Sequence, residues 1–87
     1  MKSLVHVTAA EVLEGYRLRL TFEDGTTGVI DFSAELWGPV FEPLREPARF
    51  AEVSVDPVAG TIVWPNGADF APEWLYEAAS SQSSATT

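Results

Sequence analysis

Large apolar residues alternate with polar ones along residues 16–22, and this is the clearest pattern in the chain. The residues on the apolar face are Tyr16, Leu18, Leu20 and Phe22. A period of two predicts a half-buried β-strand. The pair Asp24-Gly25 comes next and is a strong hairpin signal, so residues 27–32 are expected to return as the partner strand. Ile30 and Phe32 are the expected core residues of that partner.

The same period appears less regularly in two other places. Residues 4–13 predict a first strand. Residues 51–56 predict another, with Val53 and Val55 pointing inward. The β-branched and aromatic run 61–64 follows a turn and is expected to pair back as a second hairpin.

The helical signals are short. Ser33 is expected to cap a helical turn over residues 34–37. Prolines limit the segments that follow to about one helical turn each. The apolar residues spaced to cover a sheet face there are Phe41, Leu44 and Phe50. Pro72 suits the first position of a helix that runs to about Ala79.

Together these elements predict an α+β fold: a small antiparallel sheet of two β-hairpins, short helical turns in the middle and a short C-terminal helix. The chain has 87 residues, which is enough for one domain, and we expect that domain to cover residues 1–79. Residues 80–87 are polar and rich in Ser and Thr, so they predict a flexible tail.

Composition and charge narrow the class of function. Thirteen acidic residues against five basic ones give a net charge of −8. This argues against nucleic acid as a direct partner, because phosphate binding relies on a surplus of Lys and Arg. An acidic surface favours basic partners instead. No signal peptide is visible, and no apolar run approaches the roughly 18 residues of a membrane span. We therefore expect a cytoplasmic protein that does not bind a membrane.

The catalytic inventory is poor. His6 is the only histidine and there is no cysteine, so a zinc site or an activated nucleophile is hard to build. No Gly-x-Ser-x-Gly turn or phosphate-binding glycine loop is present. We expect no cofactor, no metal and no catalytic residue. Arg17 and Arg19 share a strand face and could clamp an anion, but pairing across strands with acids such as Glu11 or Asp31 is the favoured interpretation.

Residues 64–77, WPNGADFAPEWLYE, hold the densest set of candidate functional residues. Pro65-Asn66-Gly67 predicts a β-turn, with its asparagine able to take a positive φ. Asp69 precedes the helix and is expected to accept hydrogen bonds from the free N–H groups at its start. Trp37 and Trp74 lie in short helical segments, where a large ring can roof a small sheet or, when partly exposed, anchor a partner.

Three motifs stand in a specific order along the chain. They are Phe22-x-Asp24-Gly25, then Phe41-x-x-Leu44-x-x-Pro47-x-x-Phe50, then Trp64-Pro65-Asn66-Gly67-x-Asp69. In this order and spacing, residues 5–76 resemble a family of small bacterial proteins known as domain of unknown function 2442. The resemblance implies a small α+β fold and no established activity.

Members of that family differ in what accompanies the domain. Some carry a helix-turn-helix segment after it, and others are encoded beside a small toxin-like partner, so the resemblance implies an antitoxin-like role. Relatives often have Ser or Cys where this chain has Ala71. This difference leaves more of the helix capping to Asp69.

Two hypotheses from different classes follow. In the first, which we favour, the domain is a non-enzymatic protein-binding module, antitoxin-like, that neutralises a basic, toxin-like protein partner. In the second, it is a small-ligand-binding or catalytic domain with its site around Trp64, Asn66 and Asp69. The candidate binding residues across both are Trp64, Asn66, Asp69, Glu73, Trp74 and Glu77. Whether the chain also forms a homo-oligomer is left open.

The two hypotheses predict different surfaces. An enzyme should show a concave pocket that converges on Asp69 with a second polar group. A binding module should show an exposed apolar or acidic patch instead.

Overall fold

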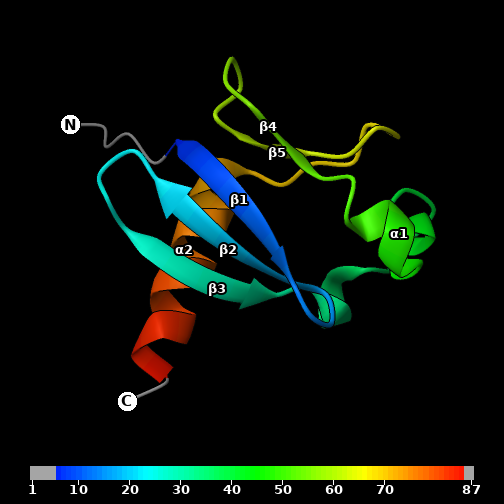
Figure 1. Ribbon diagram of the computed structural model, residues 1–87, viewed down its shortest axis with the longest axis horizontal. Helices are drawn as coiled ribbons and strands as arrows, with labels where there is room; N and C mark the ends of the chain where they lie inside the picture. The colour runs from blue at the N-terminus through cyan, green and yellow to red at the C-terminus, as the bar shows by residue number, and fades with distance from the viewer. Residues whose placement is uncertain (1–5, 86–87) are drawn as a thin grey trace.

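The computed structural model describes residues 6–85, with side chains as far as Ser80. These residues form an α+β fold (Figure 1), which confirms the fold class predicted from the sequence. The strands are β1 (Val7–Leu13), β2 (Arg17–Phe22), β3 (Thr27–Asp31), β4 (Ser54–Asp56) and β5 (Thr61–Val63). The α-helices are α1 (Pro47–Phe50) and α2 (Pro72–Ala85), and the 3₁₀ helices are η1 (Ser33–Glu35) and η2 (Glu42–Arg45).

The strands form two antiparallel sheets, whereas the sequence predicted one. The first sheet has the order β1-β2-β3, and the second pairs β4 with β5. β1 belongs to the first sheet because the chain turns back through Glu14-Gly15 and pairs β1 with β2. The two sheets meet where the Val7 N–H donates to the Gly60 carbonyl at 2.9 Å. The second hairpin therefore packs near the start of β1 instead of extending the first sheet.

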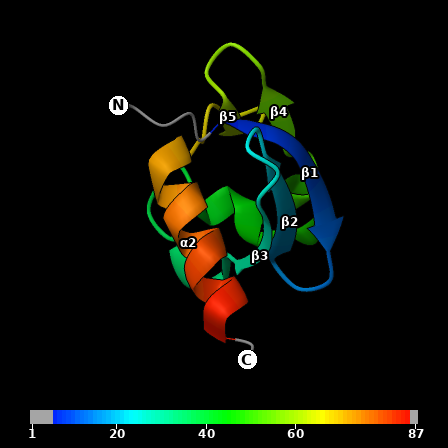
Figure 2. The same ribbon diagram turned by 90° about the vertical axis from the view of Figure 1, so that its left-hand side faces the viewer.

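The inner face of the first sheet packs against α2 (Figure 2). As predicted, alternate residues of β2 and β3 are buried there: Leu18, Leu20, Phe22 and Ile30. α2 buries Leu75 and Ala79 against the sheet. The approach is close at Gly28, where an added Cβ would come within 2.7 Å of the Ala79 carbonyl oxygen. A glycine at this position lets the helix lie directly on β3.

The final helix is longer than the sequence predicts. It begins at Pro72 as expected, but it runs to Ala85, past the predicted end near Ala79. No proline or glycine follows Pro72 to end the helix, and serine carries only a modest helix penalty. The predicted flexible tail 80–87 therefore begins with helical residues, and its last two residues lie outside the described ones. No helix in residues 6–85 has the length and apolar character that crossing a bilayer requires.

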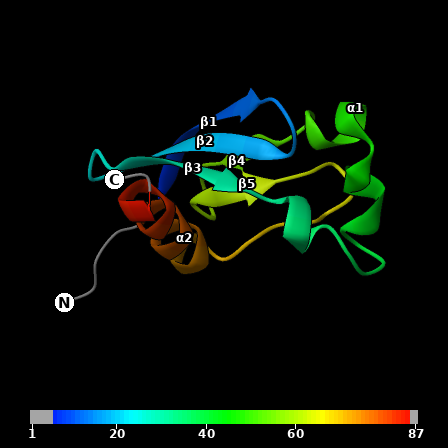
Figure 3. The same cartoon turned by 90° about the horizontal axis from the view of Figure 1, so that it is seen from below.

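The middle segment closes the core beyond β3. Phe32, Leu44 and Phe50 are buried as predicted, and Phe41 is half-buried. The prediction that Ser33 caps a helical turn is wrong. η1 starts at Ser33 without a side-chain cap of its own, and the Ser33 N–H instead donates to Asp31 Oδ1 at 2.9 Å. Seen from below, α1 and α2 lie at opposite ends of the molecule (Figure 3).

Candidate functional site

Residues 64–69 form a hairpin loop that closes on itself. The Trp64 carbonyl accepts a hydrogen bond from the Gly67 N–H at 2.9 Å, and the Trp64 N–H donates to the Ala68 carbonyl at 2.9 Å. Gly67 has a φ of 90°, as expected of a three-residue hairpin loop built on a β-turn. The predicted turn is confirmed, but the positive φ falls on Gly67 and not on Asn66.

Trp64 is a core residue. Its side chain is 1% exposed, and its indole Nε1–H donates to the Phe50 carbonyl at 2.9 Å. The rings with centroids 6.4, 5.8 and 6.0 Å from its own are those of Phe32, Phe50 and Phe70. A buried indole whose N–H is satisfied stabilises the fold. It offers no surface to a ligand or a partner, so the hypothesis that Trp64 binds one gains no support.

Asn66 is exposed, but both ends of its amide are used within the chain. Oδ1 accepts from the Ala68 N–H at 3.1 Å, and Nδ2 donates to the Val40 carbonyl at 2.9 Å. The side chain also borders a hollow of about 150 Å³ whose lining includes neither Trp64 nor Asp69. Asn66 therefore ties its loop to the segment that precedes η2.

Asp69 is exposed, and its backbone pairs with Val63 in an isolated antiparallel bridge. At the start of α2 the Leu75 N–H donates to the Ala71 carbonyl at 3.1 Å. In the part of the chain that the structure describes, no hydrogen bond joins the Asp69 carboxylate to this helix start. The predicted cap is therefore not observed, and the hollow that Asn66 borders includes neither Trp64 nor Asp69.

Three aromatic side chains form a partly exposed row that joins α2 to the middle segment. This aromatic row consists of Phe41, Phe70 and Trp74. The centroids of Phe41 and Phe70 lie 4.9 Å apart, and those of Phe70 and Trp74 lie 5.1 Å apart with the rings stacked at 18°. Phe32 is buried behind the row, 5.1 Å from Phe70 and 6.3 Å from Trp74. Trp74 is 38% exposed, so the row presents an apolar patch to solvent.

Acidic residues flank the aromatic row along the sequence. Every charged residue next to a member of the row is acidic and exposed: Glu42, Asp69 and Glu73. Glu77 is exposed on α2 three residues after Trp74, a spacing that places the two side chains on one side of the helix. Of the residues proposed from the sequence, Glu73, Trp74 and Glu77 are therefore all exposed in the first two turns of α2.

One polar contact that the sequence did not signal joins α2 to the β2–β3 turn. The Tyr76 hydroxyl donates to Asp24 Oδ2 at 2.7 Å, and Asp24 Oδ1 accepts from the Thr26 N–H at 2.9 Å. The bond from Tyr76 first, and the bonds from Thr26 next, lower the pKa of Asp24 below 3.8, because they stabilise its carboxylate form. The Asp-Gly pair signals the turn, but nothing local signals a tyrosine 52 residues later.

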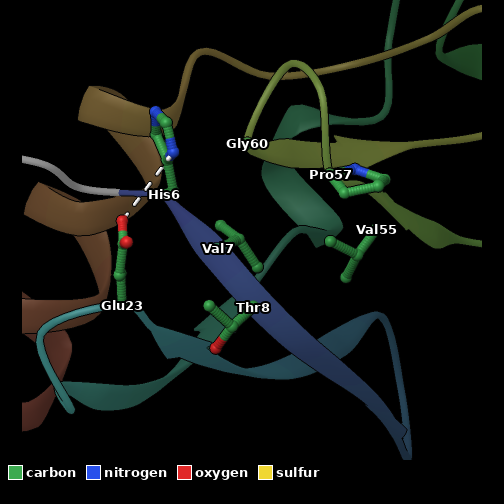
Figure 4. Close-up of a pocket in the computed structure, with 7 residues that line it drawn as sticks. All are labelled: His6, Val7, Thr8, Glu23, Val55, Pro57 and Gly60. Atoms are coloured by element: carbon green, nitrogen blue, oxygen red, sulfur yellow. Dashed lines mark ion pairs between the residues drawn. The ribbon is translucent and has the colours of Figure 1, made fainter.

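A further hollow, of about 290 Å³, lies between the start of β1 and the β4–β5 hairpin (Figure 4). His6 and Glu23 face each other at its border, with Nδ1 3.8 Å from Oε1. Both side chains are about half exposed, so this ion pair contributes little to stability. The described residues contain no group of three or more His, Cys, Asp or Glu that could hold a metal ion. The hollow therefore offers one weakly interacting pair of titratable side chains, His6 and Glu23.

Of the two arginines on the outer face of β2, Arg19 pairs with an acid across strands, as predicted. Arg19 forms an ion pair with Glu11 on β1 at 2.6 Å, and Arg17 lies opposite Asp31 in the β2–β3 register. The pKa of Asp31 is lowered by its hydrogen bonds with Ser33 first and by the charge of Arg17 last. Arg19 is therefore engaged with an acid of the same sheet, and the Arg17 Nε–H donates to the Glu14 carbonyl at 3.0 Å, so the anion clamp is not favoured.

A family model described as "Protein of unknown function (DUF2442)" matches residues 7–81 of the chain. The matched range contains all five strands, the middle segment and most of α2. No curated protein and no solved structure matches the chain.

Proposed function

The chain belongs to the DUF2442 family, and we propose that it is a non-enzymatic module that binds a basic protein partner through the aromatic row. The observation that carries this proposal is Trp74, which is 38% exposed and stacked on Phe70. Tryptophan is enriched among the residues that dominate interface energies. A ring that is already held in place also loses little conformational freedom on binding.

The fold supports the aromatic row from two sides. Phe32 is buried behind Phe70 and Trp74, and Leu75, the neighbour of Trp74, is fully buried against the sheet. On the other side, Asn66 Nδ2 donates to the carbonyl of Val40 at 2.9 Å, and Val40 is the residue that precedes Phe41. The row is thus positioned before any partner arrives, which favours binding with little rearrangement.

The charge of the chain indicates the chemistry of the partner. The net charge is −8, and the charged residues next in sequence to the members of the row are acidic and exposed. Attraction between such a surface and a basic protein raises the rate of encounter, and salt screens it. A partner with a basic surface is therefore the best fit.

An antitoxin-like role is the finer form of this proposal. It is supported by the resemblance to relatives encoded beside a toxin-like partner. A basic protein that acts on an anionic substrate would lose access to that substrate when the acidic surface of this chain covers the basic surface of that protein. Neutralisation of this kind needs no catalytic residue. The alternative, a small-ligand or catalytic site around Trp64, Asn66 and Asp69, has a buried Trp64 against it.

Association kinetics test the proposal once the tagged full-length chain has captured a basic protein. The Glu73→Lys/Glu77→Lys variant reverses two charges beside Trp74. The Glu46→Lys/Glu52→Lys variant makes the same change around α1, at the opposite end of the molecule (Figure 3). We expect the first variant to slow association by about tenfold and to weaken its salt dependence, with a smaller effect from the second.

Two results would contradict the proposal. One is equal slowing by both charge-reversal variants, which would mean that overall charge matters and the aromatic row does not. The other is a chain that captures no protein and carries a small metabolite beside Asp69 in a crystal. That result would favour the small-ligand alternative.

A further inference from the structure

β1 forms one border of the three-stranded sheet (Figure 1). In residues 6–85 no strand pairs with its far side. Edge strands are commonly protected from pairing with other chains by charged side chains, especially lysine, by proline or by a β-bulge. β1 has a register shift between Val7 and Ala9, but residues 10–13 include neither lysine nor proline. This half of the edge therefore has one charged side chain, Glu11, and lacks the other forms of protection.

The register shows which backbone groups face the open side. In an antiparallel pair, alternate residues exchange hydrogen bonds. The Phe22 N–H donates to the Thr26 carbonyl at 2.8 Å, so the even-numbered residues of β2 bond to the β3 side and its odd-numbered residues bond to β1. The β1 partners of those odd-numbered residues are Ala9, Glu11 and Leu13. The N–H and C=O groups of Ala10 and Val12 consequently point toward the open edge.

An apolar hollow of about 330 Å³ lies against this edge. Its walls include Val12, Tyr16, Pro47 and Phe50, and Glu14 is the one charged residue among those that line it. Val12 is 40% exposed and stands across from Leu18, on the inner side of the sheet. Tyr16 and Phe50 pack edge to face at 5.5 Å. A strand added to β1 would direct every second side chain to this same side, into the hollow.

The charges near β1 indicate which kind of segment fits this edge. The alternate side chains of an added strand would lie on the outer face, beside Glu11, which pairs with Arg19 at 2.6 Å. The exposed Glu14 follows β1 and borders the hollow. β1 itself contributes no basic residue. We propose that β1 binds an extended segment of a partner protein, in which apolar residues alternate with Lys or Arg, by strand addition. This goes beyond the proposed function, because it uses a surface separate from the aromatic row.

A second copy of the chain is a poorer occupant of this edge. Two β1 strands paired antiparallel about Glu11 would set the two Glu11 side chains across from each other. Like charges in that position are destabilising, although Arg19 of the same chain, 2.6 Å from Glu11, offsets part of that repulsion. A segment with alternating basic residues has the complementary charge.

A peptide titration of the full-length chain, followed by amide NMR, tests the proposal. The probe is the peptide Lys-Leu-Lys-Val-Lys-Leu-Lys, and its control has Glu in place of every Lys. We expect the lysine peptide to give saturable shifts and slower hydrogen exchange at the Ala10 and Val12 amides. The glutamate peptide should bind at least about tenfold more weakly.

Variants separate strand addition from general charge attraction. Ala10→Pro removes an outward N–H and spares the β1–β2 hydrogen bonds, since proline is tolerated on an edge where the N–H faces solvent. It should weaken binding by about tenfold. Val12→Lys places a like charge in the wall of the hollow and should weaken binding similarly. Its matched control is Val58→Lys in the β4–β5 turn, where the side chain is 92% exposed, and binding should not change. If Ala10→Pro fails to fold, the two lysine variants still decide the question.

The proposal fails if the lysine peptide shifts no β1 amide, if both peptides bind equally, or if Val58→Lys weakens binding as much as Val12→Lys. It also fails if the Ala10 and Val12 amides of the free chain become protected as its concentration rises, since a second copy is then the occupant. Trp74→Ser should leave peptide binding unchanged. The effect of Trp74→Ser on the affinity for the captured protein tests the aromatic row separately.

Discussion

Two loops of this molecule are alike in backbone structure and differ in what they hold. The loops, residues 23–25 and 65–67, each end in a glycine with a φ of 90° and are closed by two backbone hydrogen bonds to the residue before the loop. In each, the side chain of the middle residue, Asp24 or Asn66, accepts a hydrogen bond from the N–H two residues later. The Asx-Gly pair therefore sets the local structure in the same way twice.

The difference is in the remaining polar atom of that middle side chain. Asp24 accepts from the Tyr76 hydroxyl on α2 at 2.7 Å, whereas Asn66 donates to the Val40 carbonyl at 2.9 Å. Asp24 is a carboxylate whose pKa is lowered by its hydrogen bonds, and Asn66 is a neutral amide. The first loop thus holds α2 through a bond that acid can weaken. The second holds the approach to the aromatic row through a bond that does not titrate.

Replacing the glycine of either loop should have the largest effect. Nothing lies within 4 Å of an added Cβ at Gly25 or Gly67, so the cost of Gly25→Val or Gly67→Val is conformational, about 1–3 kcal/mol each. Urea unfolding measures both losses, and similar values would show that the two loops are alike. Gly67→Asn should cost less, because asparagine visits the left-handed region more readily. A valine variant as stable as the wild type would contradict the shared loop structure.

Removing the amide of Asn66 should have the next largest effect. Asn66→Ala loses the hydrogen bonds to Val40 and Ala68. We expect the free energy of unfolding to fall by about 0.5–1.5 kcal/mol, the typical contribution of one such hydrogen bond. The loss should be the same at neutral and acidic pH, since no titrating group is involved. A loss confined to one end of the pH range would mean that the two loops do not differ as described.

Tyr76→Phe should have a smaller effect, and one that depends on pH. The folded-state pKa of Asp24 lies below its ordinary 3.8, so its stabilising contribution is present above the unfolded-state pKa and is lost as pH falls through the folded-state pKa. The variant keeps a ring against Phe22, 5.1 Å away in the wild type, but it removes the donor. Thermal melts should show a shallower loss of stability in acid than for the wild type. Identical slopes would show that the Tyr76 bond does not stabilise the carboxylate.

Asp69→Ala should have the smallest effect on stability, within about 0.5 kcal/mol. Its backbone bridge to Val63 does not depend on the side chain, and no bond from its carboxylate to the start of α2 is observed in the described residues. Denaturant unfolding of this variant is the measurement. A loss above about 1 kcal/mol would restore the cap predicted from the sequence. Unchanged stability with lost partner binding would instead make Asp69 part of the binding surface.

The sequence predicts the features that depend on neighbouring residues. Alternation along β2 identifies Leu18 and Leu20 as buried, because side-chain direction in a strand follows directly from residue spacing. Both Asx-Gly pairs identify their turns, because left-handed backbone at the glycine is a local requirement. Pro72 marks the start of α2 for a similar reason.

Long-range partners are what the sequence does not reveal. Nothing in the sequence around Trp64 and Trp74 shows that their environments differ. Trp64 is buried with its indole N–H bonded to the Phe50 carbonyl, whereas Trp74 is partly exposed on α2. The link between Asp24 and Tyr76 spans 52 residues and leaves no local pattern. Of the residues proposed as the site, Trp64 belongs to the core, and the binding role of Glu73, Trp74 and Glu77, which are exposed on α2, stays a prediction.

The central claim is that the chain binds a protein through the aromatic row, and a pair of tryptophan variants tests it most directly. The measurement is the dissociation constant of the captured basic partner for Trp74→Ser and Trp37→Ser, with melts to confirm that both variants fold. Trp37 is the more exposed, at 69%, but it is not part of the row. We predict that Trp74→Ser weakens binding by about thirtyfold, as expected of an interface anchor, and that Trp37→Ser weakens it much less. Unchanged affinity for Trp74→Ser, or a larger loss for Trp37→Ser, would contradict the account.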